Sequence, residues 1–122
     1  MNSYKELTVW QKAVELTIDI YRITTDYPKS ELYGLVQQTR RSAVSIPSNV
    51  AEGWARKHRQ EYLQFLNVAI GSAAELETQI VIAKKLKFLS DEDSKRTSGL
   101  ITEVMKMLNA FMTSLKSKST RP

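Results

Sequence analysis

Apolar residues recur every three or four positions along most of the chain, which is the spacing of one face of an α-helix. A first helix is predicted from about residue 6 to residue 26, on the spacing of Leu7, Trp10, Val14, Ile18 and Tyr21. Tyr27-Pro28 ends it, because the residue before a proline avoids helical angles. A second helix is predicted from about residue 30 to residue 54, with a kink at Pro47, since proline lacks the N–H that an interior position donates.

A third helix is predicted from about residue 59 to residue 87. The fourth begins near Ser90 and carries a seam of alternating four- and three-residue spacings, made by Thr97, Ile101, Val104, Leu108, Phe111 and Leu115. Such a seam is typical of left-handed bundle packing. The pattern therefore predicts an all-α fold, an antiparallel up-and-down four-helix bundle. We expect this bundle to be a single domain over residues 1–122, with flexible ends at about 1–5 and 117–122.

The third predicted helix is apolar on more than one side. Besides its core face it carries Val68, Ile70, Val81 and Ile82 elsewhere around the helix, and the small run from Gly71 through Ser72 to Ala74. A helix that is apolar on several sides is usually buried on several sides. Two interpretations stand at this point: a slightly overpacked central helix, or a helix that also forms an interface between subunits.

Composition narrows the class of protein. The chain has 122 residues, no cysteine, and a net charge of +5 from 18 basic and 13 acidic residues. Disulfides and thiolate metal sites are therefore excluded. The N-terminal stretch has no apolar segment of signal-peptide length, so we expect a cytoplasmic protein that does not enter a membrane. A basic excess repeated around an assembly of identical subunits would attract polyanions.

Residues 38–56 combine an apolar face with a stripe of hydrogen-bonding groups. On a helical wheel the stripe contains Arg41, Ser45, Ser48, Asn49, Glu52 and Arg56. One interpretation is a kinked core helix with a solvated outer face, and the other is a surface for a partner. Arg40 projects from the apolar side, where an unpaired charge is costly. We therefore predict that Arg40 is buried and paired with Glu75 or Glu77 ahead of Glu52, within or across subunits.

The run RRSAVSIPSNVAEG at 40–53, followed by Arg56, resembles the central motif of a bacterial family called four helix bundle proteins or 23S rRNA-intervening-sequence proteins. Three further pieces fit in family order: VWQKAVEL at 9–16, the YP–E–YGL pattern at 27–35, and AIGSAAELETQI at 69–80. The resemblance implies an antiparallel four-helix bundle that assembles as a ring of five. The related retroelement accessory variability proteins are basic and bind nucleic acid and a reverse transcriptase.

The resemblance favours the oligomer interpretation of the third helix, so we expect a closed homo-oligomer, a pentamer, with the second and third helices at the interface. Residues assigned to structure or to that interface are Arg40, Ser45, Pro47, Asn49, Glu52, Gly53, Gly71, Ser72, Glu75 and Glu77. Glu75 and Glu77 diverge by about 200° on a helix, so they do not form a catalytic carboxylate pair.

No constellation typical of an enzyme is present in the sequence. His58 is the single histidine, Ser45 and Ser48 have no nearby base, and no glycine-rich phosphate loop occurs. No cofactor or metal is expected. The leading hypothesis is a scaffold that binds RNA or DNA weakly through phosphate contacts made by Arg41, Arg56, Lys57 and Arg59, with Lys116 and Lys118 secondary. The alternative is a protein–protein interaction scaffold without nucleic-acid binding.

Overall fold

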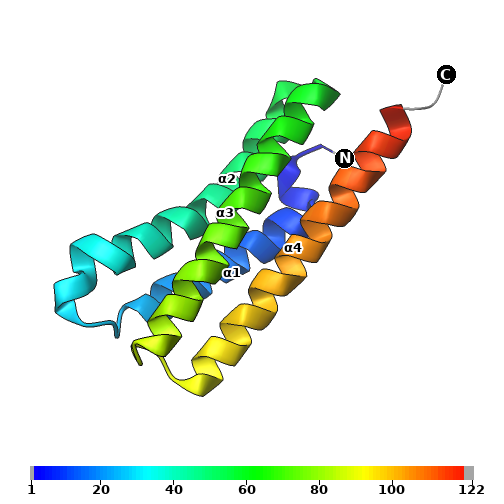
Figure 1. Ribbon diagram of the computed structural model, residues 1–122. Helices are drawn as coiled ribbons and strands as arrows, with labels where there is room; N and C mark the ends of the chain where they lie inside the picture. Colours follow the sequence, from blue (N-terminus) through cyan, green and yellow to red (C-terminus); the bar gives the residue numbers. More distant parts are fainter. Residues whose placement is uncertain (1, 120–122) are drawn as a thin grey trace.

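The computed structural model describes residues 2–119, with side chains described through Ser117, and every regular element in this range is helical. Four α-helices form the body: α1 (Thr8–Thr24), α2 (Gln37–Arg56), α3 (Arg59–Lys85) and α4 (Asp91–Ser119). Short turns precede α1 and α2, namely the 3-10 helices η1 (Tyr4–Glu6) and η2 (Lys29–Glu31) and the π-helix η3 (Leu32–Val36). The predicted all-helical bundle is confirmed (Figure 1).

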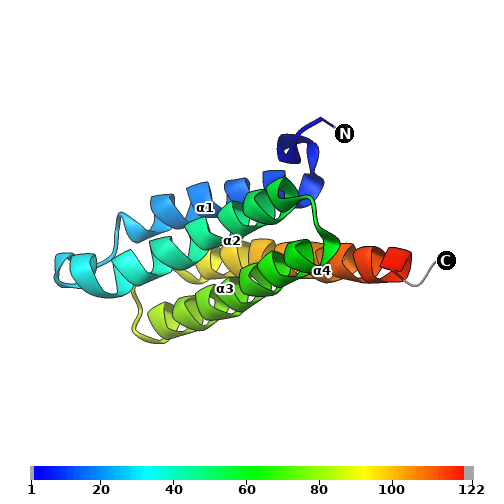
Figure 2. The ribbon, with the colours of Figure 1, turned by 90° about the horizontal axis from the view of Figure 1, so that it is seen from above.

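Each helix packs against two neighbours, so the four surround one core. The packed pairs are α1 with α2, α2 with α3, α3 with α4, and α1 with α4. The α1–α2 and α3–α4 connections lie at one end of the bundle, and the α2–α3 connection lies at the other (Figures 1 and 2). The two ends of the molecule therefore carry different connections.

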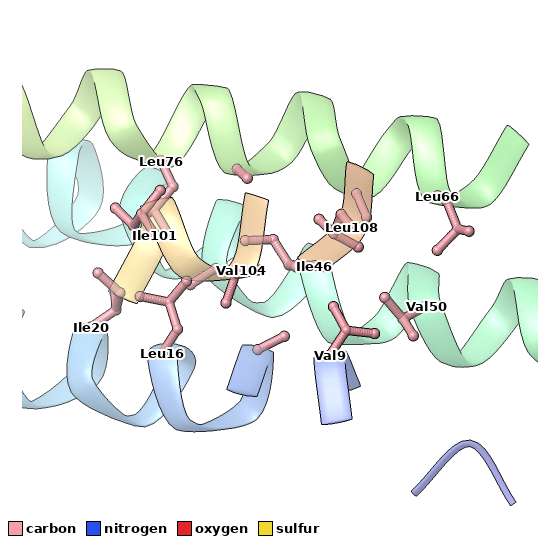
Figure 3. Packing of buried hydrophobic residues seen from close by; sticks show 14 of the residues in the cluster. Val9, Leu16, Ile20, Ile46, Val50, Leu66, Leu76, Ile101, Val104 and Leu108 are labelled. Carbon is pink, nitrogen blue, oxygen red and sulfur yellow. The ribbon is translucent and has the colours of Figure 1, made fainter. Parts of the chain in front are cut away.

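The core is built from the apolar face of all four helices. Leu16, Ile46, Leu76 and Ile101 come from α1, α2, α3 and α4 in turn, and each is fully buried. Figure 3 shows them pointing into the space between the ribbons. Burying a side chain of this size contributes about 1.5–3 kcal/mol. The predicted seam of α4 lies in this core, with Phe111 and Leu115 packed at its margin.

The start of the second helical segment differs from the expected single helix beginning near residue 30. Residues 29–36 form η2 and η3, and the departure from helical dihedral angles lies at Gly34 (φ −114°, ψ −107°). The side chain of Glu31 accepts a hydrogen bond from the Leu35 amide over 3.3 Å. Pro47 is buried inside α2, and a kink there stays a prediction.

Pro47 leaves one carbonyl of α2 without its usual partner, that of Ala43, four residues earlier. The hydroxyl of Thr17 on α1 lies 3.1 Å from this oxygen and also 2.8 Å from the Ala13 carbonyl of its own helix. The orphaned acceptor is thus satisfied across the α1–α2 contact. Asn49 of α2 does not fill this role, since it donates to the Ser45 carbonyl.

The connection between α2 and α3 consists of Lys57 and His58 alone. Lys57 has φ 63°, the left-handed conformation that commonly ends a helix. Gly53, one turn earlier, is buried against α3: a Cβ there would lie 2.7 Å from Tyr62 Cδ1 and 3.0 Å from Phe65 Cβ. The close approach of α2 and α3 therefore requires glycine at this position.

The ends of the described chain are more regular than expected. Residues 4–6 form η1, and the ring of Tyr4 packs 5.4 Å from Trp10 and 6.1 Å from Trp54, measured between centroids. Helix α4 continues through Ser119, so residues 117–119 of the expected flexible end are helical. Flexibility of the ends stays a prediction, and residues 120–122 lie outside the described range.

Gly53→Ala should destabilise the protein, because the added methyl group overlaps Tyr62 and Phe65. We expect a loss of about 1–2 kcal/mol in the free energy of unfolding, after the better helix propensity of alanine is included. Gly99→Ala is the matched control, since a Cβ at Gly99 meets no atom within 4 Å. It should gain up to about 1 kcal/mol. Equal stabilities of the two variants in urea unfolding would contradict the tight contact.

Candidate nucleic-acid and partner interface

Positive charge gathers around the α2–α3 connection. Arg56, Lys57 and Arg59 are all exposed there. The Nε atom of Arg56 lies 3.2 Å from Glu52 Oε2, and its guanidinium lies 5.2 Å above the ring of Phe65. Lys57 and Arg59 form no ion pair with the rest of the described chain. These groups are consequently available to an external anion.

Only some of the other predicted contact residues join this cluster. Lys116 is exposed near the end of α4, which lies at the same end of the bundle as the α2–α3 connection (Figures 1 and 2). The side chain of Lys118 lies outside the described part. Arg41 is exposed on α2 but, at a rise of 1.5 Å per residue, lies roughly 22 Å from Arg56 along the helix. The structure therefore separates Arg41 from the basic end.

Part of the polar stripe of α2 is used inside the molecule. The hydroxyls of Ser45 and Ser72 lie 2.8 Å apart across the α2–α3 contact. Asn49 Nδ2 donates to the Ser45 carbonyl over 2.7 Å and to its hydroxyl over 2.9 Å. Ser72 is buried, while Ser45 and Asn49 are half-buried. These residues hold two helices together, so they contribute less to an outer surface than the sequence alone suggested.

The predicted partner of Arg40 was wrong for the single chain. Arg40 is half-buried, its Nε donates to the Thr24 hydroxyl over 2.9 Å, and its guanidinium lies 4.5 Å from the centroid of the Tyr21 ring. Glu75 and Glu77 are exposed and form no ion pair among the described residues, whereas Glu52 pairs with Arg56. A hydroxyl and an aromatic face replace the expected carboxylate, because α1 is the nearer neighbour of Arg40. Pairing across subunits stays a prediction.

The buried carboxylate belongs to Asp19, which sequence analysis missed. Asp19 is 9% exposed; its Oδ1 accepts from Arg22 Nη2 (2.9 Å) and Arg96 Nε (3.1 Å), and its Oδ2 accepts from the Thr97 hydroxyl (2.6 Å). The network joins α1 to the first turns of α4. A signal was present, since Asp19 directly precedes the core residue Ile20. The pattern could not show which cations of a distant helix would meet it.

Titratable groups give little sign of acid–base chemistry. Burial raises the pKa of Tyr27 and Tyr62 to about 12, so both phenols stay neutral at physiological pH. The ion pairs with Glu103 and Glu15 raise the pKa of the Lys12 amine. His58 is exposed in the connection. Within residues 2–119 no group of three or more His, Asp and Glu side chains is placed to bind a metal ion.

An open apolar groove lies between α1 and the beginning of α2, and the sequence pattern did not reveal it. Its volume is about 610 Å³, and its lining includes Tyr21, Leu32, Tyr33, Arg40 and Val44. Arg41 and Ser45 border this groove and also a second, polar cleft of about 310 Å³ between α2 and α3, which Ser72 and Glu75 line as well. The structure thus brings together the predicted interface residues Arg40, Arg41, Ser45, Ser72 and Glu75.

Helix α3 has a second apolar face, as its sequence predicted. Its core side carries Leu66, Leu76 and Ile80, while Val68 and Ile82 are exposed by 51% and 43%. By length and hydropathy α3 alone among the described helices is apolar enough to cross a membrane, a property that it shares with core helices of water-soluble bundles. Gly71, on the exposed side, has no neighbouring atom within 4 Å of a Cβ.

The chain matches a protein-family model and has a fold similar to that of a solved structure. A family model described as 23S rRNA-intervening sequence protein matches residues 5–110. The fold is similar to the crystal structure of a protein of unknown function from the S23 ribosomal protein family of Bacteroides thetaiotaomicron, with a TM-score of 0.78 and 22% sequence identity. The match covers 86% of this chain and 98% of the other. No curated protein matches the chain significantly.

Asp19→Ala should lower the free energy of unfolding by about 2–4 kcal/mol. The buried Thr97 hydroxyl, Arg22 and Arg96 would all lose the carboxylate to which they donate. Arg40→Ala should cost only about 1 kcal/mol, the value of one part-buried hydrogen bond and an aromatic contact. Chemical unfolding of both variants measures the difference. If Arg40→Ala lowered the free energy of unfolding more than Asp19→Ala, the result would favour the carboxylate partner for Arg40 that the sequence predicted.

Proposed function

The chain belongs to the 23S rRNA-intervening sequence protein family, and we propose that it is a non-enzymatic homo-oligomeric scaffold that binds RNA or DNA through one basic end of its bundle. The observation that carries this proposal is the exposure of Arg56, Lys57 and Arg59 around one short connection, with Lys116 at the same end. The net charge of +5 has the same sign.

Binding through this end would be dominated by phosphate. Arginine and lysine side chains contact phosphate oxygens without reading sequence, and no described element is arranged to enter a groove and read base edges. Affinity for one subunit should therefore fall in the range typical of nonspecific contacts, about 10⁻⁴ to 10⁻⁶ M at physiological salt. Lys118 would extend the same cluster, whereas Arg41 is too distant to share it.

Assembly would strengthen this weak contact. We propose a closed ring, a pentamer of antiparallel up-and-down bundles in the cytoplasm, with α2 and α3 at the subunit interface. The exposed apolar face of α3 supports an interface, because a heterologous contact that repeats with the right rotation closes a ring. A ring repeats the basic end, and several weak sites on one polyanion raise the overall affinity.

A second candidate function is a protein-interaction scaffold that does not bind nucleic acid. The apolar groove lined by Tyr21, Leu32, Tyr33 and Val44 favours it, since tyrosine and arginine beside aliphatic side chains are typical of protein interfaces. Salt separates the two functions. Phosphate contacts weaken steeply as salt rises, and apolar docking does not.

The combined replacement Arg56→Ser, Lys57→Asn and Arg59→Ser should weaken binding of a fluorescently labelled oligonucleotide. Asparagine is used at residue 57 because it tolerates the left-handed conformation there. Loss of three phosphate contacts should lower the slope of log K against log salt by about 2 for single strands. Fluorescence anisotropy over a salt series measures this slope.

The matched control is Lys84→Ser, Lys85→Ser and Lys95→Ser, which removes the same charge from exposed positions near the α3–α4 connection at the opposite end. This control should retain most of the salt dependence. Equal losses in both triple variants would mean that net charge, rather than the basic end, attracts the oligonucleotide. Absence of binding by the parent protein at low salt would end the nucleic-acid proposal and favour the protein scaffold.

A further inference from the structure

We propose that the apolar groove between α1 and α2 of one molecule receives the exposed face of α3 from a second copy of the same chain. This inference rests on the homo-oligomeric part of the proposed function and names the two surfaces that meet. The first surface is the α1–α2 groove, and the second is the α3 stripe, formed by Val68, Gly71, Glu75, Thr78 and Ile82.

Large apolar side chains of the α1–α2 groove are exposed to solvent. Tyr33 is 87% exposed, and Leu32, Val44 and Tyr21 are exposed by 48%, 40% and 43%. Tyr33 and Leu32 belong to η3, where the chain departs from helical angles at Gly34. An exposed cluster of this kind, in an otherwise well-packed bundle, marks an interaction site. Its tyrosines and arginine are the residue types that contribute most to protein binding.

One wall of the groove is already ordered. Arg40 donates to the Thr24 hydroxyl over 2.9 Å and to the Tyr21 carbonyl over 3.4 Å, with its guanidinium above the Tyr21 ring. These contacts hold two large side chains in place before any partner arrives. Docking on an ordered wall loses less conformational entropy than docking on free side chains.

The α3 stripe is an exposed and partly apolar line of residues on one face of the helix, which is the kind of surface that packs against another chain. Its residues follow spacings of three and four, so they lie in one line along the helix, and all are exposed. Val68 and Ile82 supply apolar contacts toward its two ends. Gly71 is bare of neighbours and allows another chain to come close. Such a stripe fits a shallow groove of matching apolar character.

Charge complementarity indicates that the partner is this same chain. Arg40 and Arg41 border the α1–α2 groove and form no ion pair with a described carboxylate, while Glu75, in the middle of the α3 stripe, forms none with a described cation. Arg41 and Glu75 of one molecule border the same cleft without forming an ion pair. Each surface therefore offers the charge that the other lacks.

The two surfaces are different, so the contact is head-to-tail. Every copy keeps one free groove and one free stripe until a ring closes. Nucleic acid is a less suitable occupant of the groove, because Arg40 already covers a face of Tyr21 and the aliphatic side chains of Leu32, Val36 and Val44 also line it. The basic end stays outside both surfaces, which leaves it open to an anion after assembly.

The test uses two interface variants of the full chain, Tyr33→Asp in the groove and Ile82→Asp in the stripe. Val81→Asp is the matched control. Val81 is 48% exposed and Ile82 is 43% exposed, but Val81 faces α4 and lies outside the α3 stripe. Tyr33→Phe is the conservative control for the groove. Sedimentation velocity measures the mass of each protein, and circular dichroism confirms that each remains helical.

We expect the parent, Val81→Asp and Tyr33→Phe to form oligomers, and Tyr33→Asp and Ile82→Asp each to sediment as the 13.9 kDa monomer. Mixing the two defective variants should restore one intact contact, between the groove of Ile82→Asp and the stripe of Tyr33→Asp. The mixture should then contain a dimer and nothing larger. This outcome is specific for a head-to-tail interface.

Other outcomes overturn the inference in distinguishable ways. A monomeric parent would remove the oligomeric part of the proposed function as well. An oligomeric parent that tolerates Tyr33→Asp and Ile82→Asp would place the interface elsewhere and leave the proposed scaffold standing. Weaker oligonucleotide binding by Tyr33→Asp with an unchanged oligomer would assign the groove to nucleic acid. A mixture that stays monomeric would exclude the head-to-tail pairing.

Discussion

The close packing of α2 on α3 is the constraint on which the remaining structure depends. Gly53 leaves no room for a side chain between the helices, and the Ser45–Ser72 hydrogen bond holds the same pair together farther along. Because the helices run so close, a connection of Lys57 and His58 is sufficient to join them. The short connection in turn crowds Arg56, Lys57 and Arg59 together. The geometry of the candidate anion site is thus a consequence of a packing requirement.

Polar contacts fix the position of α1 against α2 and α4. The Thr17 hydroxyl satisfies the Ala43 carbonyl that Pro47 leaves free, and Asp19 binds Arg96 and Thr97 of α4. Hydrogen bonds to a charged group contribute about 1.5–3 kcal/mol each and are directional, so they set register more sharply than apolar contacts. Arg40 can then reach Thr24 and cover Tyr21, which shapes the wall of the groove.

Assembly and ligand binding are proposed on separate parts of the molecule. The groove lies toward the end with the α1–α2 connection and the stripe runs along α3, whereas the basic residues lie at the end with the α2–α3 connection. This separation allows a ring to form without covering the cations. It also allows the two activities to be removed independently by substitution, which a single shared surface would prevent.

Periodicity in the sequence was sufficient to predict four helices and the core seam of α4, because every helix buries a regular face. It misplaced the buried face of α1: Ile18 and Tyr21 of the predicted stripe are 65% and 43% exposed, and the core takes Leu16, Ile20 and Ile23 instead. It also indicated the second apolar face of α3 and the basic character of residues 56–59. Tertiary structure alone decided the partners. Arg40 meets a hydroxyl and an aromatic ring, Asp19 meets cations far along the chain, and Arg41 is separated from Arg56. Helical spacing determines which way a side chain points, but only the packing of helices distant in sequence determines what it touches.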